Sequence, residues 1–255
     1  MKKFLTVLLV LALTVTALIG CAKQDVPEVV EGDTTDVVEE NLPEAGAEPE
    51  VEVEPEVTVM TYEEYVAAEI DAPVVIEAYV QGKQSWWDNK ATVYTQDEDG
   101  AYFLYELACS EEDYALLEVG TKIRVSGYKA EWAGEVEIVD GTFEILEGSY
   151  IAQPVDATAW LGTDELIKHQ NELVYFTGMT VEEISFKNEG GDDIYVTLSK
   201  DGQSYDFCVE RYLTDPETEV YKAVSALKAG DVIDVEGFLY WYEGVNTHIT
   251  SVTVA

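Results

Sequence analysis

An internal repeat constrains the fold of this chain more than any other feature of its sequence. Six apolar and glycine positions of one segment return 110 residues later in the chain. They are Leu117, Gly120, Ile123, Val125, Gly127 and Gly134, which return as Leu227, Gly230, Ile233, Val235, Gly237 and Gly244. Upstream, Tyr105-Glu106-Leu107 matches Tyr205-Asp206-Phe207 at a shorter offset, because the second copy carries a longer insert. Self-similarity at a fixed offset predicts two copies of one structural unit, over residues 61–150 and 151–255.

Each copy predicts the same order of helices and strands. A capping box at Thr61 and Glu64 opens a short helix, and Thr163-Asp164-Glu165 begins its counterpart. Three strands should follow, with the second and third joined by turns at residues 97–100 and 200–202. A crossover helix, opened by Ser110 in one copy and by Asp215-Pro216 in the other, leads to a last hairpin over residues 122–145 or 232–254. Gly120 and Gly230 are expected at the C-terminal ends of the crossover helices.

Five strands with a helix between the third and the fourth form the layout of the OB-fold, a small barrel. On the motif Gly-x-x-Ile-x-Val-x-Gly at residues 120–127 and 230–237, the chain resembles the OB-fold-like domains found in tandem in bacterial surface lipoproteins. The resemblance covers about residues 61–255. It implies a mainly β protein with two tandem five-stranded OB-fold-like barrels and short helices, and it says nothing about the ligand. An immunoglobulin-like sandwich is the alternative, although a helix in each copy fits it poorly.

The N-terminal segment indicates an export signal. Lys2 and Lys3 precede an apolar run from Phe4 to Ile19, which is shorter than the roughly 20 apolar residues of a membrane span. The run ends in Leu18-Ile19-Gly20-Cys21, which resembles the lipobox of bacterial lipoproteins. The resemblance implies a signal peptide over residues 1–20 and a lipid anchor, including palmitate, on Cys21. We therefore expect an extracytoplasmic protein that is lipid-anchored to the cell membrane; an uncleaved membrane anchor is the alternative.

Residues 21–60 are dominated by Glu, Asp, Pro and Val, and a stretch of this composition cannot bury a core. They predict a disordered acidic tether that holds the folded part away from the lipid surface. The whole chain carries a formal charge of -38, and residues 61–255 contain 39 acidic and 11 basic residues. Because nucleic-acid binders gain most of their affinity from cations that displace phosphate counterions, this charge disfavours nucleic acid as a partner.

Motifs of catalytic or cofactor chemistry are missing from the sequence, which predicts a protein that is not an enzyme and needs no cofactor or metal. His169 and His248 have no ligand-spaced partners, so each is expected to be an ordinary surface or sheet histidine. Cys109 and Cys208 lie in apolar strands and are expected to be free buried thiols, with one disulfide as the alternative. The acidic clusters at residues 97–100 and 190–193 favour turns over calcium sites.

The aromatic residues are the candidates for a binding site. OB-folds bind ligands along strands two and three, between the loop that joins strands one and two and the loop that joins strands four and five. The rings expected in or beside these loops are Trp86, Trp87, Trp132, Tyr240 and Tyr242. Counting alternate residues from Ile123 places Trp132 on the face opposite the core, unless a bulge at Gly127 reverses the count. Such rings stack on bases or sugar rings, or else they close the ends of the barrels or pack one domain on the other. For Trp160, packing at the domain junction is expected.

The sequence thus predicts a non-catalytic binding protein whose loop aromatics hold an oligosaccharide or a neutral or cationic envelope partner. Two alternatives stay open. One is a structural or protein-interaction scaffold of the cell envelope, and the other is single-stranded nucleic-acid binding.

Overall fold

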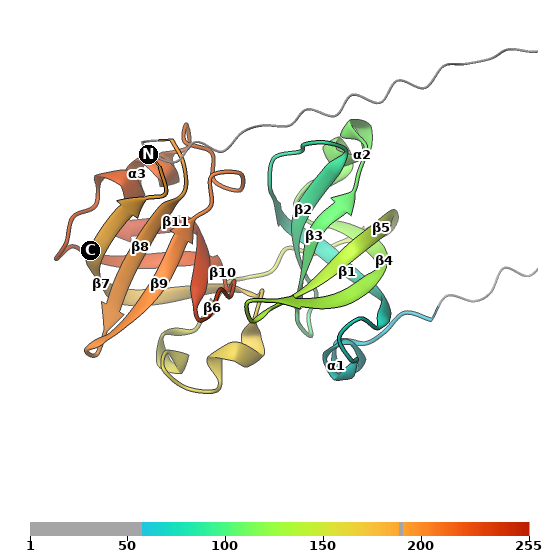
Figure 1. Ribbon diagram of the computed structural model, residues 1–255, viewed down its shortest axis with the longest axis horizontal. Coiled ribbons are helices and arrows are strands. Elements are labelled where there is room, and N and C mark those ends of the chain that lie inside the picture. Colours follow the sequence, from blue (N-terminus) through green and yellow to red (C-terminus); the bar gives the residue numbers. More distant parts are fainter. Residues whose placement is uncertain (1–57, 189–190, 255) are drawn as a thin grey trace, which may run out of the picture. The chain divides into compact units, whose positions relative to one another are not determined.

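The computed structural model describes residues 58–188 and 191–254. The predicted signal peptide, the predicted anchor at Cys21 and the predicted tether up to residue 57 lie outside these residues. In what is described, the protein is mainly β and consists of two five-stranded barrels with short helices (Figure 1).

The first barrel closes in the order β1-β2-β3-β5-β4. Its strands are β1 (Pro73–Lys83), β2 (Lys90–Gln96), β3 (Ala101–Ala108), β4 (Thr121–Trp132) and β5 (Glu135–Ser149). All neighbours are antiparallel except β3 and β5, and β1 pairs with β4 to close the barrel. Helix α2 (Glu111–Leu116) connects β3 to β4. This order, with a helix between the third and fourth strands, is the OB-fold.

The second barrel has the same strand order, because β10 pairs with both β11 and β7 while β9 and β11 are parallel. Its strands are β7 (Leu173–Phe186), β8 (Ile194–Lys200), β9 (Gln203–Val209), β10 (Val232–Phe238) and β11 (Asn246–Val254). Helix α3 (Glu219–Ala226) connects β9 to β10. A two-residue strand, β6 (Val155–Asp156), adds to the start of β7.

The shared glycine motif has a specific role in both barrels. Gly120 and Gly230 adopt positive φ angles of 93° and 95°, and their N–H groups donate to the carbonyls of Val80 and Val181 on the first strand of each barrel. Gly127 lies at a β-bulge of β4, where a Cβ would meet Val139 O at 2.8 Å. Gly237 lies at the matching bulge of β10. The glycines therefore mark the turn and the close strand approach that both barrels need.

The helices agree with the sequence in part. Helix α1 (Tyr62–Ala67) has the predicted capping box at Thr61 and Glu64, and Ser110 caps α2. Other predictions were wrong in detail. Thr163-Asp164-Glu165 leads into a 3₁₀ turn, η2 (Leu166–His169), rather than an α-helix, and α3 is capped by Thr218, three residues after the predicted start. A second 3₁₀ turn, η1, spans Thr158–Trp160.

Two further predictions need correction. Gly120 and Gly230 lie three residues beyond the C-caps of α2 and α3, so they form the turn into the next strand rather than the helix end. Trp160 packs against the core of the second barrel and stacks on His169 with ring centroids 3.9 Å apart, because β6 and η1 direct it there.

Each barrel encloses its own apolar core, and the outer face of β2 and β3 is buried as well. On that face Tyr94 stacks on Phe238 with centroids 4.5 Å apart, and Phe103 meets Tyr240 edge-on at 5.2 Å. Side chains and backbone add hydrogen bonds, among them Leu173 N to Gln96 Oε1 at 2.9 Å. The four rings join the β10–β11 side of the second barrel to the outer face of β2 and β3 of the first, and we call them the junction cluster.

Glu135, at the start of β5, is a fully buried carboxyl group beside this cluster. Its Oε2 accepts a hydrogen bond from Trp241 N at 2.9 Å, whereas its Oε1 and the nearby Asn171 Oδ1 have no partner among the described residues. Burial raises the pKa of Glu135 to about 9. With this pKa the carboxyl group is protonated, and therefore neutral, at pH 7.

We expect Glu135→Gln to make stability less dependent on pH. The folded-state pKa is raised, so this contribution to stability is complete below about pH 4.5 and is lost as the pH rises toward 9. At pH 7 the loss is on the order of 3 kcal/mol, which a glutamine avoids. Urea unfolding at pH 5, 7 and 8.5 should give curves for wild type and variant that separate increasingly with pH. Equal separation at all three values would contradict a buried neutral carboxyl group.

Candidate functional site

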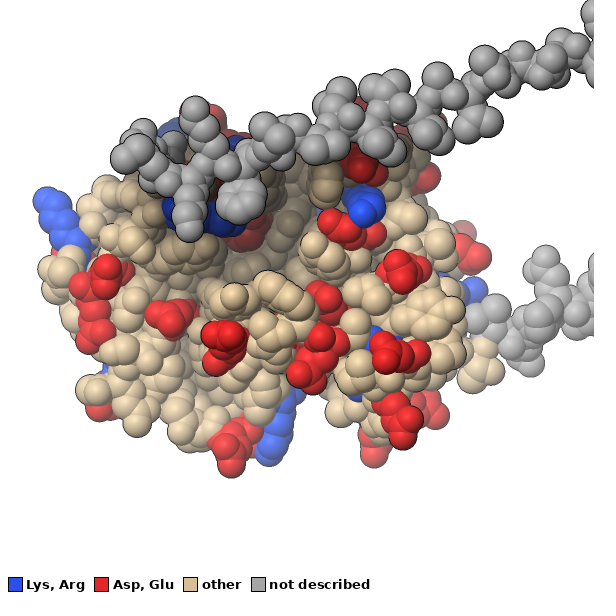
Figure 2. Space-filling model, in the orientation of Figure 1, with Lys and Arg blue, Asp and Glu red and all other residues tan. Residues whose placement is uncertain are grey.

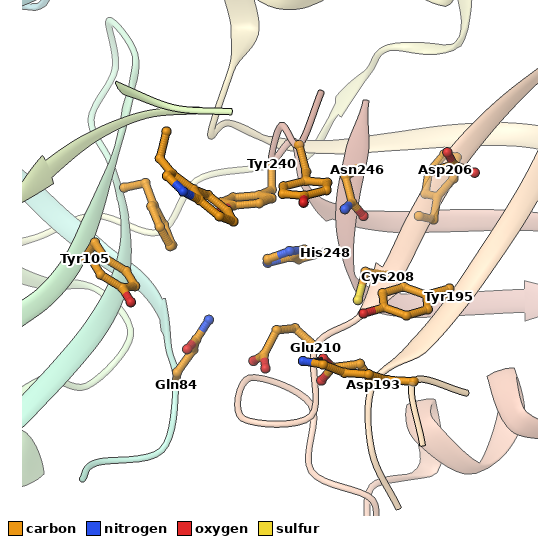
Figure 3. Close-up of a pocket in the computed structure, with 15 residues that line it drawn as sticks. Gln84, Tyr105, Asp193, Tyr195, Asp206, Cys208, Glu210, Tyr240, Asn246 and His248 are labelled. Carbon is orange, nitrogen blue, oxygen red and sulfur yellow. Dashed lines mark hydrogen bonds and ion pairs between the residues drawn. The ribbon is translucent and has the colours of Figure 1, made fainter. Parts of the chain in front are cut away.

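A cleft of about 720 Å³ lies on the outer face of the second barrel (Figure 3). Its floor is formed by β8 and β9, which contribute Tyr195, Asp206 and Cys208. Lys187, just after β7, and Asp193, just before β8, bound it on one side, and Tyr240 and Tyr242, between β10 and β11, bound it on another. These are the strands and loops with which OB-folds bind ligands. The first barrel adds Gln84, Phe103, Tyr105 and Trp132 to the rim.

Three of the five predicted rings come together in this cleft. Trp132 and Tyr242, from the last hairpin of each barrel, are 55% and 46% exposed and have ring centroids 5.2 Å apart. The bulge at Gly127 leaves Trp132 on the predicted outer face. Tyr240 is buried in the junction cluster and stacks on His248 at 4.2 Å, so it forms part of the wall rather than an exposed platform.

Trp86 and Trp87 line a second hollow of about 440 Å³, together with Tyr212. Trp87 is exposed, whereas the half-buried Trp86 donates its indole N–H to the Cys109 carbonyl at 2.8 Å. Tyr105 and Gln84 line both hollows, so the two adjoin. The predicted rings therefore lie along one continuous, largely aromatic surface.

Carboxyl groups dominate the charge of the cleft. Asp193 pairs with Lys187 at 2.9 Å and also accepts from Arg211 N. Glu210 Oε2 accepts from the backbone N–H groups of Tyr212 and Leu213, both at 2.9 Å. Burial, followed by the charge of Asp193, raises the pKa of Glu210 to about 7. Figure 3 shows the Glu210 carboxyl directed into the hollow.

His248 carries a hydrogen-bond donor at the wall of the cleft. Tyr94 accepts a bond from Gln84 Nε2 at 3.1 Å, so its own hydroxyl hydrogen is free to donate to His248 Nδ1, 2.6 Å away. Burial lowers the pKa of His248 to about 3, which keeps the ring neutral. A neutral ring that accepts at Nδ1 has its hydrogen on Nε2.

Sequence reasoning missed Tyr195 and Glu210, and it gave His248 no role. The alternation of β8 contained a signal for the first: Val196 and Leu198 lie in the core, which places Tyr195 on the outer face. Glu210 follows the end of β9 as one acidic residue among many. His248 gains its environment from Tyr94, 154 residues away in the chain, which no local pattern reveals.

The other candidate groups have structural surroundings. Within residues 58–188 and 191–254, no group of three or more His, Cys, Asp or Glu side chains could hold a metal ion. Asp97 Oδ1 accepts from the N–H groups of Asp99 and Gly100, as a turn residue does. Cys109 and Cys208 are free and buried, and burial raises the pKa of Cys109 to about 11 and that of Cys208 as well. Both thiols are therefore protonated at neutral pH. None of the described helices has the length and apolar composition to cross a membrane.

No protein-family model matches the chain, and no curated protein matches it. Among solved structures, the tetrameric p202 HIN2 is similar at 12% identity and a TM-score of 0.31, over 73% of this chain and 96% of that one. A murine DNA-binding protein bound to double-stranded DNA is similar at 12% identity and a TM-score of 0.35, over 72% and 96%. Replication protein A bound to single-stranded DNA gives 13% identity and a TM-score of 0.29, over 71% and 48%. At these TM-scores the similarity carries no conclusion about what this chain binds.

We expect His248 to stay neutral from pH 8 down to about pH 4, with its hydrogen on Nε2, because the buried ring has a pKa near 3. Nitrogen-15 NMR of the two histidines would give the tautomer and the titration directly, and His248→Gln assigns the signals. A His248 signal that titrates near pH 6.5, or a hydrogen on Nδ1, would contradict the hydrogen-bond chain from Gln84 through Tyr94.

Proposed function

We propose that this chain is a non-catalytic binding protein that holds an oligosaccharide in the cleft of the second barrel. The observation that carries the proposal is the position of the cleft on the OB-fold ligand face, with Tyr195 on its floor and Trp132 and Tyr242 at its rim. Aromatic rings stack on the apolar faces of sugar rings. The carboxyl and amide groups of Glu210, Asp206 and Gln84 can bond the hydroxyl groups, which gives orientation.

The charge of the molecule supports an uncharged or cationic ligand over a polyanion. In the described part of the cleft lining, Lys187 is the one lysine or arginine, and Asp193 neutralises it. On the face seen in Figure 2, acidic side chains are spread widely and basic ones are few. A phosphate chain would meet the carboxyl groups of Asp206 and Glu210, while the one lysine among the described residues that line the cleft is already paired, so the counterion term that favours nucleic-acid binding is weak there.

The ring stacking can be tested by tryptophan fluorescence of the full-length chain, titrated with short neutral and amino-sugar oligosaccharides and with single-stranded oligonucleotides. We expect saturable binding of a saccharide, and a roughly tenfold weaker affinity in Trp132→Ala and in Tyr195→Ala, since one stacked ring is worth about 1–3 kcal/mol. Tyr128→Ala is the matched control, because Tyr128 is an equally exposed ring that does not line the cleft.

Binding of a saccharide that the cleft variants do not weaken would place the site elsewhere. Binding of the oligonucleotide alone, with an affinity that falls steeply with salt, would replace the saccharide proposal by nucleic-acid recognition.

We also propose that the chain is exported and anchored through a lipid on Cys21, which the lipobox-like Leu18-Ile19-Gly20-Cys21 supports. In a bacterial host fed labelled palmitate, the wild-type chain should incorporate the label and sediment with membranes. Cys21→Ser should lose the label, since no thiol remains at that position. Cys109→Ser serves as the control, because Cys109 is buried in the first barrel. Equal labelling of wild type and Cys21→Ser would rule out this anchor.

A further inference from the structure

Two carboxyl groups of the cleft have no cationic partner among the described residues. Lys187, the lysine that lines the cleft, already forms an ion pair with Asp193. Asp206 is exposed and bonds only the Thr197 hydroxyl, at 3.2 Å. Glu210 is held by backbone N–H groups through one oxygen and forms no ion pair in the described part of the chain. Its carboxyl group is directed into the hollow (Figure 3).

An independent observation comes from His248, which is 94% buried and lines the same cleft. Its Nε2–H donor has no hydrogen-bond partner among the described residues, whereas its Nδ1 is occupied by Tyr94. Nε2 is not enclosed, so an oxygen of a ligand in the cleft can accept a hydrogen bond from it. The cleft therefore offers both acceptors and a fixed donor.

The rings around these groups restrict the ligand further. Tyr105, Trp132 and Tyr195 line the cleft, and the face of an aromatic ring attracts a positive charge. The combination of ring faces with an unpaired carboxylate is the one that proteins use for ammonium groups. The His248 donor adds a contact that an ammonium group cannot make but a sugar hydroxyl or ring oxygen can.

We propose that the cleft recognises an amino sugar whose amino group is free and protonated, with the ammonium group against Glu210 and a sugar oxygen opposite His248 Nε2–H. This inference rests on the proposed saccharide binding and names the class of saccharide. An N-acetylated or amino-free sugar keeps the stacking and the His248 contact but leaves Glu210 without a cation.

The test compares three disaccharides of the same linkage in calorimetric titrations of the full-length chain at pH 6.5: one with free amino groups, one N-acetylated and one with hydroxyl groups only. We expect the free amino form to bind at least about tenfold more tightly, as charge-assisted hydrogen bonds do. Glu210→Gln should remove this preference and leave the affinity for the neutral sugars within about twofold. A glutamine keeps the oxygen that accepts from Tyr212 and Leu213, so the loop should fold as before.

Glu147→Gln is the control for charge, because it removes one exposed carboxyl group outside the cleft and should keep the preference. Equal affinities for the three sugars in wild type would overturn the ammonium inference while the proposed saccharide binding stands. No binding of any of the three, with tryptophan fluorescence also unchanged, would overturn both. If Glu147→Gln lowers the preference for the free amino form as much as Glu210→Gln does, the preference comes from the overall charge of the chain. That result would overturn the inference.

Proton release gives a second readout. At pH 6.5 Glu210 is partly protonated, and an ammonium group beside it should displace that proton. Among the neighbours that face it, Asp193 forms an ion pair with Lys187, burial raises the pKa values of Cys208 and Tyr94, and burial keeps His248 neutral. Glu137, with a pKa raised to about 7, lines a smaller hollow with Tyr105 and Trp132, and Glu137→Gln controls for it.

Titrations in buffers of different ionisation enthalpy should show that wild type and Glu137→Gln release up to about one proton more per amino sugar than Glu210→Gln does. Equal proton release by all three proteins would overturn the contact between Glu210 and the amino group.

Discussion

The junction cluster is the interaction on which the cleft and the hollow beside it depend. Tyr94 and Phe103 occupy the outer face of β2 and β3, where an OB-fold would bind its ligand, and they meet Phe238 and Tyr240 there. Aromatic pairs in these geometries are worth about 0.5–1.5 kcal/mol each beyond the area they bury. The first barrel thus uses its ligand face for packing, and the second keeps its own face open.

The same cluster explains why the cleft draws on both barrels. Phe103 lies in the junction cluster, and Tyr105 follows it by two residues on the same face of β3. Tyr105 therefore lies at the edge of the cluster, where its ring is exposed and lines the cleft. Tyr94, on β2, carries the hydroxyl that is hydrogen-bonded to His248 Nδ1. Single strands therefore contribute to both features: one residue of a strand packs in the junction cluster, and a neighbouring residue lines the cleft.

The sequence predicted the strand order and several rings because those features have local or periodic causes. The glycines at the turn and at the bulge recur at one spacing, and alternation along β4 placed Trp132 on the outside. Lys129 shows where such reasoning stops. It occupies a core position of β4, and its ammonium group bonds the carbonyls of Tyr65, Val66 and Ala68 at the end of α1. That partner lies more than 60 residues away, so alternation alone could not explain a buried lysine.

The candidate site was less predictable for a related reason. Loop aromatics can be found from the layout of the fold, but the groups that give the cleft its chemistry owe their properties to distant neighbours. Burial and the charge of Asp193 raise the pKa of Glu210, as burial does for Glu135 and Glu137, and nothing in the local sequence marks these three among the many carboxyl groups of the chain. His248 differs from His169 because it is enclosed by Tyr94 and Tyr240, whereas His169 stacks on Trp160 beside Glu172. The sequence alone does not distinguish one histidine from the other, or Glu210 from the other acidic residues. Tertiary packing gives His248 and Glu210 their particular environments and places both in the lining of the same cleft.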